Sequence, residues 1–455
     1  MNNRRTSWHS IVFGIVPHPE TSSILMLPDA NSSGWTLPAV ELDRRMGFSA
    51  VWPVTHAMTE LLGTSVTALR CVTQNVDEDN HTYHGTFILE NDGSMAISLL
   101  DGCWINQDTL AELTISDKID RSLLQQYLDE TKGDIPQNRR AWQQPDWYST
   151  AHKWIRSSLE AKGYTLVGSI EQFDSWGLTC LMTVATDRGT IFFKTAPGLP
   201  LFAHEPNVMM GLATLFPGQI PKPVAVEPTL RWMLLAGFGS TLDSLPEEEV
   251  NAVRGEIMRR FGELQIEAIP YIEKLLGFGC LDRRLAHLIP HAKEILSDKQ
   301  FMLCFEAEEA QRLRARLPLL QKLCKQLTDF NIPETLIHGD LGTGNVAGDV
   351  KHPLFFDWTE AAISHPFFDI FDMFFADDLA KRANIRKSYL SVWETYEPQH
   401  RLLEAWSIAR PLCALYHLIS YHNIYSNLEN PYQEAMLYFV RLWSKRVLEY
   451  TSDLA

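Results

Sequence analysis

The stretch that most constrains this 455-residue chain is residues 335–372, TLIHGDLGTGNVAGDVKHPLFFDWTEAAISHPFFDIFD. A short apolar run leads into a polar, glycine-rich loop, and a second apolar run ends at an aspartate. Asp340 lies in the loop, Asn345 follows five residues later, and Asp357 follows Asn345 after twelve. Asp and Asn are common in turns, but this fixed spacing on a loop, a strand and a second loop predicts a functional site.

These three side chains supply the groups that phosphoryl transfer from ATP requires. The Asp340 carboxylate can orient an attacking hydroxyl and accept its proton. The Asn345 amide oxygen and the Asp357 carboxylate can hold Mg²⁺ against the phosphates. The spacing H-x-D-x-x-x-x-N, followed by a strand and an aspartate, is that of a kinase catalytic loop. We therefore expect an ATP- and Mg²⁺-dependent phosphotransferase with its catalytic loop at residues 336–345.

The segments HGDLGTGN and DWTEAAISHPFFD are similar to those of the aminoglycoside phosphotransferase and choline kinase branch of the protein-kinase-like fold. The resemblance covers about residues 150–450. It implies a bilobal α+β fold, with a β-rich N-lobe at residues 151–240 and a helical C-lobe at residues 241–455. It also implies a small-molecule acceptor that carries a hydroxyl, such as an aminoglycoside-like antibiotic, a sugar or an amino alcohol. The residues do not choose between these acceptors.

The expected N-lobe begins with three strands joined by the turn sequences DSWG and DRG. The third strand ends at Lys194, which matches the kinase lysine that pairs with the α- and β-phosphates. The following helix offers Glu205 as the ion-pair partner that would hold this lysine in place. The loop expected to cover the phosphates contains only Gly177, so the kinase G-x-G-x-x-G pattern is missing.

The resemblance also implies residues that bind the adenine base, residues that support the catalytic loop and residues that line the acceptor site. Backbone groups near Leu235 and Gly237 are expected to bond the adenine base at the hinge. His338 is expected to support the catalytic loop, and Asp369 resembles the family's buried aspartate that bonds the backbone of this loop. Candidate acceptor-lining residues are Asp372, Asp377, Asp378, His417, Tyr421 and His422.

Residues 1–115 alternate short strands and turns around one helix near Val54–Leu62. The segments SSILMLPDANSSGWTLPAVEL and THAMTELLGTSV are similar to a Nudix domain, in which a strand leads into W-x-L-P-G-G and a helix carries R-E-x-x-E-E-x-G. Ala39 and Val40 replace the two glycines, and of the metal-binding glutamates only Glu60 remains. One carboxylate cannot hold a metal at a pyrophosphate. We therefore expect a small α/β/α domain that has lost hydrolase activity.

Residues 116–150 are expected to connect the two parts. A helix is predicted over residues 117–130, where apolar residues recur at helical spacing. The polar segment that follows contains two prolines and is typical of a linker. A second helix is expected after Asp146, whose side chain can cap it; the residues that share one of its faces are Trp147, Ala151, Trp154, Ile155 and Leu159.

Length and composition limit the remaining possibilities. A chain of 455 residues predicts two or three domains. A formal net charge of −16 argues against nucleic acid as a main partner. No apolar run reaches about 18 residues, so no membrane span is predicted. Seven singly spaced cysteines and an N-terminus without a signal-peptide pattern favour a cytoplasmic protein. The oligomeric state stays open.

Two other functions remain as alternatives. The chain could be a non-catalytic, nucleotide-binding regulatory protein in which both domains have lost activity. The presence of all four residues expected of an active kinase argues against this; they are Lys194, Asp340, Asn345 and Asp357. It could also be a Nudix-type hydrolase of nucleoside diphosphate derivatives, and the missing glutamates argue against that.

Overall fold

The computed structural model describes residues 8–30, 34–91, 101–133, 135–369 and 379–452. The chain divides into two compact units. The first consists of Met1–Lys194 and Leu428–Glu434, and the second consists of Thr195–Asn427 and Ala435–Ala455. Within the described ranges, no helix combines the length and the apolar character needed to cross a membrane.

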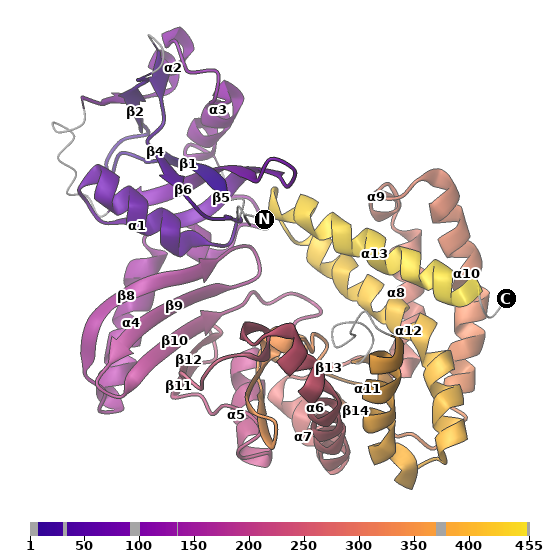
Figure 1. Ribbon diagram of the computed structural model, residues 1–455. Coiled ribbons are helices and arrows are strands. Elements are labelled where there is room, and N and C mark those ends of the chain that lie inside the picture. Colours follow the sequence, from indigo (N-terminus) through magenta and orange to yellow (C-terminus); the bar gives the residue numbers. More distant parts are fainter. Residues whose placement is uncertain (1–7, 31–33, 92–100, 134, 370–378, 453–455) are drawn as a thin grey trace, which may run out of the picture. The chain divides into compact units, whose positions relative to one another are not determined.

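The first unit contains short strands and helices (Figure 1). Its strands are β1 (His9–Ile15), β2 (Ile24–Pro28), β3 (Trp35–Thr36), β4 (Ala39–Leu42), β5 (Val66–Asp77), β6 (Thr82–Asn91), β7 (Cys103–Ile105), β8 (Leu166–Ser175), β9 (Cys180–Thr186) and β10 (Gly189–Thr195), of which β10 ends one residue into the second unit. Its helices are α1 (Val51–Leu62), α2 (Gln107–Glu112), α3 (Arg121–Glu130), η2 (Ala141–Gln143) and α4 (Trp147–Ala161).

The N-terminal part of this unit is a mixed sheet covered by helix α1. The strand order is β4-β1-β6-β5, in which β1 runs parallel to β6 and antiparallel to β4. Val54 and Met58 on α1 are fully buried. A Cβ at Gly14 on β1 would lie 3.2 Å from the Met58 Cε atom, so the small residue allows the helix to approach the sheet closely. The helix begins three residues earlier than the sequence indicates.

Helix α4 has the buried face that its sequence predicts, with Ala151, Ile155 and Leu159 fully buried. The predicted side-chain cap at Asp146 is wrong. This residue has φ 65° and makes no side-chain cap hydrogen bond. Its backbone N–H donates instead to Glu90 Oε1 at 2.6 Å, so the start of α4 is joined to strand β6.

The later part of the proline-containing segment before α4, residues 139–143, makes several contacts within the first unit. The Arg139 guanidinium pairs with Glu130 at 3.1 Å and with Glu429 at 2.8 Å. Trp142 is buried, and its Nε1–H donates to the Trp176 carbonyl at 2.7 Å. These contacts fix the segment against the turn between β8 and β9.

The second unit is mainly helical (Figure 1). Its helices are α5 (Glu205–Leu215), η3 (Leu242–Ser244), α6 (Glu247–Ala268), η4 (Ile269–Tyr271), α7 (Ile272–Phe278), α8 (Leu285–Ser297), α9 (Lys299–Met302), α10 (Ala307–Leu327), η5 (Thr343–Asn345), η6 (Pro366–Phe368), α11 (Leu379–Ser391), η7 (Val392–Thr395), α12 (Gln399–Ser426) and α13 (Tyr432–Ser452), which begins in the first unit. Its strands are β11 (Ala225–Glu227), β12 (Trp232–Ala236), β13 (Leu281–Asp282), β14 (Thr335–Ile337), β15 (Val346–Asp349), β16 (His352–Phe355) and β17 (Ala362–Ser364).

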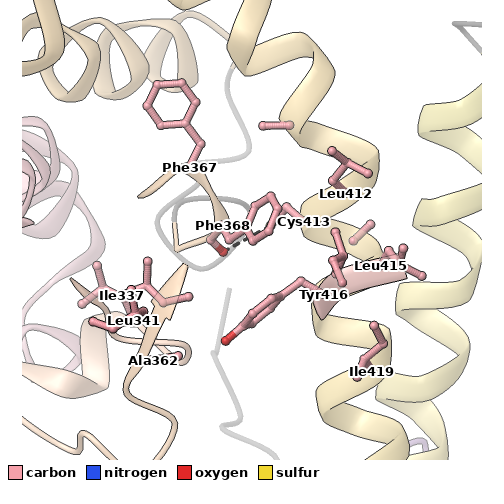
Figure 2. Packing of buried hydrophobic residues seen from close by; sticks show 14 of the residues in the cluster. Ile337, Leu341, Ala362, Phe367, Phe368, Leu412, Cys413, Leu415, Tyr416 and Ile419 are labelled. Carbon is pink, nitrogen blue, oxygen red and sulfur yellow. Dashed lines mark hydrogen bonds between the residues drawn. The ribbon is translucent and has the colours of Figure 1, made fainter. Parts of the chain in front are cut away.

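The core of the second unit supports the stretch with which the sequence analysis began. Figure 2 shows Phe368 between the strand residue Ile337 and side chains of helix α12, among them Cys413 and Tyr416. The Cys413 thiol on α12 also donates to the Phe368 carbonyl at 3.2 Å. The loop after β14 is therefore built on a buried and well-packed base.

Candidate active site

The loop that carries Asp340 begins at a buried strand. All three residues of β14 are buried, and β14 pairs antiparallel with β17. The chain then turns at Gly339, where φ is +85°. A Cβ at this position would lie 2.6 Å from the Glu360 carbonyl oxygen, so the turn requires glycine. The turn leaves Asp340 only partly buried, where a substrate could reach it.

Asp369 holds this turn from the inside. Its carboxylate accepts hydrogen bonds from the backbone N–H groups of His338 at 2.5 Å and of Gly339 at 2.7 Å. Burial raises the pKa of the Asp369 carboxyl to about 7, and the two N–H donors oppose that rise. These are the backbone hydrogen bonds that the sequence led us to expect from this aspartate.

His338 connects the loop to the strand that precedes Asp357. Its side chain is fully buried, and Nε2 lies 2.8 Å from the Phe356 carbonyl oxygen. Its ring centroid lies 4.6 Å from that of Trp358. A histidine in these surroundings supports the loop, as we expected, and is too enclosed to take a proton from a substrate.

The β15–β16 hairpin brings Asn345 next to the residue before Asp357. Val346 pairs with Phe355, and the Phe356 N–H donates to the Asn345 carbonyl at 3.1 Å. Asn345 and Asp357 are separated by twelve positions in sequence, but the antiparallel pairing places them at the same end of the hairpin.

Direct hydrogen bonds then connect Asn345 to Asp340. The Asn345 Nδ2 group donates to the Asp340 carbonyl at 2.7 Å and to its carboxylate at 3.3 Å. This orientation leaves the Asn345 Oδ1 atom as the part of the amide that can meet a cation. The structure therefore brings Asn345 into contact with Asp340 and with Phe356, the residue before Asp357, whereas the roles given to these residues stay predictions.

Asp357 adopts a backbone conformation that is rare for its residue type. Its φ is +64°, in the left-handed region, where a residue other than glycine costs about 1–3 kcal/mol. The Thr359 hydroxyl donates to Asp357 Oδ1 at 2.8 Å. Carboxylate and amide oxygens are the hard donors that Mg²⁺ prefers, so Asn345 and Asp357 fit a magnesium ion that shares phosphate ligands.

Glu360 is a site residue that the sequence analysis missed. Burial raises the pKa of its carboxyl above the usual range, and the negative charges of Asp340 and Asp357 raise it further. The positive charge of Arg283 lowers the same pKa. Three carboxylates therefore influence one another here. The position of Glu360 three residues after Asp357 was the available signal, but spacing alone did not show that the chain turns back toward Asp340.

The predicted nucleotide-contacting residues fall in both units. Glu205 is the first residue of α5 and is buried. The Ala203 N–H just before it donates to the Thr359 carbonyl at 2.8 Å, which joins the start of α5 to the segment that follows Asp357. Lys194 is buried in β10, in the first unit, and its pairing with Glu205 stays a prediction.

The predicted hinge lies close to the catalytic strand in the second unit. Leu235 is buried in β12, and Gly237 is exposed immediately after it. The Phe238 ring lies 4.8 Å from that of Phe356, the residue before Asp357. The sequence analysis did not identify this aromatic pair, because Phe238 lies about 120 positions before Phe356 and outside the motif that contains Phe356.

The described acceptor candidates have different surroundings. His417 is in the core, where burial lowers its pKa to about 3 and where its ring stacks on Trp443 at 4.4 Å. The His422 Nε2 atom lies 3.1 Å from the carboxylate of Asp298, which caps the N-terminus of α9. Tyr421 lies near the site. Burial raises the pKa of its hydroxyl, and the negative charges of Asp340 and Glu360 raise it further. Asp372, Asp377 and Asp378 lie outside the described residues.

Residues 190–406 match the sequence model of the phosphotransferase enzyme family. The match covers just under half of the chain and indicates a phosphotransferase. It includes every residue assigned above to catalysis, nucleotide or metal. It does not include residues 1–115, whose likeness to Nudix domains stays a prediction. No curated protein matches the chain.

The solved structures to which this chain is similar include kinases of small molecules. A choline/ethanolamine kinase family protein from Mesorhizobium loti is 15% identical, with 63% of this chain and 92% of that chain covered and a TM-score of 0.43. A type I macrolide 2′-phosphotransferase is 13% identical, with 65% and 97% covered and a TM-score of 0.46. A Plasmodium vivax ethanolamine kinase is 13% identical, with 76% and 97% covered and a TM-score of 0.48.

Proposed function

We propose that this chain transfers the γ-phosphate of ATP to a hydroxyl group of a small molecule, with Mg²⁺ as the metal ion. The observation that carries the proposal is the connected arrangement of Asp340, Asn345 and Asp357. A buried strand presents the first residue, a hydrogen bond of 2.7 Å joins it to the second, and the β15–β16 hairpin brings in the third. The family match over residues 190–406 supports the same reaction class.

In this proposal Asp340 positions the acceptor hydroxyl and accepts its proton. The residue is held from both sides, because Asp369 fixes the turn before it and Asn345 donates to its carbonyl and carboxylate. A base that is already oriented loses little entropy when the substrate binds, and this positioning accounts for much of a kinase's rate.

The cofactors in the proposal are ATP and Mg²⁺. Asn345 and Asp357 would hold the metal, which supplies positive charge that neutralises the phosphates. Lys194, kept in place by Glu205, would contact the α- and β-phosphates. The backbone near Leu235 and Gly237 would bond the base, and the Phe238 and Phe356 rings would border it.

The N-terminal residues have no hydrolase role in this proposal. Glu60 is largely exposed on α1, and the ionisable partner found beside it is His56, whose Nε2 lies 3.6 Å away. All seven cysteines lack disulfide bonds, and five of them are buried, which supports a reducing compartment such as the cytoplasm.

The test is a screen for ATP consumption with hydroxylated small molecules, which includes aminoglycosides, sugars and amino alcohols. We expect at least one acceptor to give turnover that depends on Mg²⁺. The Asp340→Asn variant should lower kcat by about 10²–10⁴-fold because general-base catalysis is lost, whereas ATP affinity measured by calorimetry should stay near that of the parent. Turnover in this variant equal to the parent's would remove Asp340 from the mechanism.

A further inference from the structure

The first unit contains a cavity of about 980 Å³ that the proposed phosphotransfer does not use. Its walls come from helix α1, strand β8, helix α4 and the loops beside them. In Figure 1, α1 and β8 lie next to each other within this unit. A cavity of this size can enclose a ligand with the dimensions of a nucleotide or a drug.

One wall of the cavity is aromatic. The rings of Trp52 and His56 on α1 are stacked, with centroids 5.4 Å apart and planes only 4° from parallel. Trp52 is 41% exposed, which is unusual for so large an apolar side chain. The Trp52 Nε1–H donates to Glu171 at 3.1 Å, so the indole is held in position without a ligand. A flat, fixed ring of this kind offers a stacking surface for another aromatic ring.

Another part of the lining is cationic. Lys153 and Arg156 project from α4 at i and i+3, a spacing that places both on one face of the helix. Within the described ranges, neither side chain has a hydrogen bond or ion pair, and both line the cavity. Their charges are therefore available to an anionic group.

Two of the three carboxylates that line the cavity accept hydrogen bonds from neutral groups of the protein. Glu171 accepts from Trp52 at 3.1 Å and from Ser169 at 3.1 Å, and Glu90 accepts from the Asp146 N–H at 2.6 Å. The Asp146 carboxylate also lines the cavity, as do the imidazoles of His18, His56 and His152. Lys153 and Arg156 are the lysine and arginine of the lining, so an anionic group in the cavity would bind beside them and away from the three carboxylates.

We propose that this cavity binds a small organic anion that carries an aromatic ring, with the ring on Trp52 and the anionic group at Lys153 and Arg156. The site lies outside the segment matched to the phosphotransferase family, which begins at residue 190. It is also separate from Asp340, Asn345 and Asp357, which all belong to the other unit.

Strand β8 connects this cavity to the loop that we expect to cover the phosphates. Gln172 lines the cavity, and its side-chain amide makes three hydrogen bonds to the N-terminal sheet and helix. It accepts from the Ala68 N–H at 2.8 Å and from the Thr55 hydroxyl at 2.9 Å, and it donates to the Ala68 carbonyl at 2.8 Å. Thr55 lines the cavity too, so a ligand there would lie beside both Gln172 and the Thr55 hydroxyl that donates to it.

Two residues farther along β8, the contact with the N-terminal part continues. The Ser49 hydroxyl donates to Asp174 at 3.1 Å, and the Ser175 N–H donates to the Ser49 carbonyl at 3.0 Å. The Trp176 ring lies 5.3 Å from that of Phe48. The turn between β8 and β9 is therefore fixed by residues 48–49, and the ligand in the cavity should make this turn more rigid.

The binding test uses 1-naphthyl phosphate as the probe, with 1-naphthol and inorganic phosphate as its two halves. Binding to the full-length chain is measured by calorimetry with a non-hydrolysable ATP analogue and Mg²⁺ present in excess, so that the nucleotide site is blocked. We expect 1-naphthyl phosphate to bind with a Kd below 1 mM and each half to bind at least tenfold more weakly.

Variants of the two walls decide where the probe binds. Lys153→Ala combined with Arg156→Ala should weaken binding at least tenfold, and Trp52→Ala should do the same. Lys162→Ala is the matched control, since Lys162 follows the same helix but does not line the cavity, and it should bind as the parent does. No binding, or binding that the double variant retains, would overturn the site whether or not the chain proves to be a kinase.

Hydrogen exchange tests the connection to the turn independently of catalysis. Saturation with the probe should slow amide exchange at least threefold in residues 166–186, and the Lys153/Arg156 double variant should not show this effect. Unchanged exchange in these strands at full occupancy would overturn the link to β8 and β9.

Discussion

At the scale of single residues, the metal assignment gives the sharpest prediction. If Asn345 and Asp357 hold Mg²⁺ together with phosphate oxygens, the metal should bind weakly alone and tightly with nucleotide. Asp357→Ala should then abolish the part of ATP affinity that depends on Mg²⁺, whereas Asp340→Ala should keep it. The measurement is ATP affinity by calorimetry across a series of Mg²⁺ concentrations.

Lys194→Ala serves as a comparison in the same experiment. It removes a positive charge from the phosphates, so ATP should bind more weakly at every Mg²⁺ concentration, and extra Mg²⁺ should not restore the loss. If Asp357→Ala kept the parent's dependence on Mg²⁺, the metal would have to bind elsewhere and the role given to the end of β16 would be wrong.

A second residue-scale prediction concerns Asp174 in the turn between β8 and β9. Burial raises its pKa to about 6, although the Ser49 hydrogen bond opposes the rise. The pKa in the unfolded chain is about 3.9, so the folded state holds this proton more tightly. The free energy of unfolding that the group contributes therefore falls as the pH rises from about 4 to about 6.

Asp174→Asn should remove this pH-dependent loss. We expect the variant to be more stable than the parent by about 1–2 kcal/mol at pH 7.5 and nearly equal to it below pH 4. Chemical denaturation at several pH values measures the difference. A difference that is the same at pH 4.5 and pH 7.5 would show that Asp174 ionises normally in the folded protein.

At the scale of elements, the catalytic loop depends on Asp369. Its carboxylate accepts two buried backbone N–H groups, at 2.5 and 2.7 Å. Asp369→Ala leaves both donors without a partner, and each such loss costs about 1–3 kcal/mol. We therefore expect a clearly lower melting temperature and a lower kcat, because the turn that presents Asp340 loosens.

The control for this prediction is Asp349→Ala. Asp349 lies at the exposed turn of the nearby β15–β16 hairpin, where its carboxylate accepts from the N–H groups of Lys351 at 2.7 Å and His352 at 3.1 Å. Those donors can turn to water when the acceptor is removed, so stability and kcat should change little. Equal effects of the two variants would contradict a special role for the buried carboxylate.

The elements near the motif could be predicted from the sequence because local patterns specify them. Apolar runs predict the buried strand β14 and the strand before Asp357. The glycine, asparagine and aspartate residues between these runs predict the loop. Glu360 and Phe238 could not be found in this way, because their role depends on where the chain turns back. The same holds for Gln172, since its hydrogen bonds are made to residues about 100 positions earlier.

At the scale of the whole molecule, the N-terminal residues are structurally joined to the strands that follow them. The buried amide of Gln172 and the turn at Ser175 both depend on hydrogen bonds from residues 49–68. A chain that lacks residues 1–115 would expose these groups together with the apolar face of β8. We expect it to be less soluble and to melt at least several degrees below the full-length chain.

Gln172→Leu in the full-length chain tests the same contact on a smaller scale. The leucine leaves the Ala68 N–H and carbonyl without partners, so we expect a smaller but measurable fall in melting temperature. A truncated chain that remained soluble, with an unchanged melting temperature, would show that the N-terminal residues form an independent domain.

Residues 428–434 have a consequence for how the chain is made. They belong to the first unit, where the Cys71 N–H donates to the Tyr432 hydroxyl at 3.1 Å and the Phe48 and Tyr432 rings lie 5.2 Å apart. Because a ribosome releases the chain from the N-terminus, the first unit lacks these contacts until nearly all of the second unit has been synthesised. The nascent N-terminal region must therefore stay competent to fold while more than two hundred later residues emerge, and chaperones have that interval in which to act.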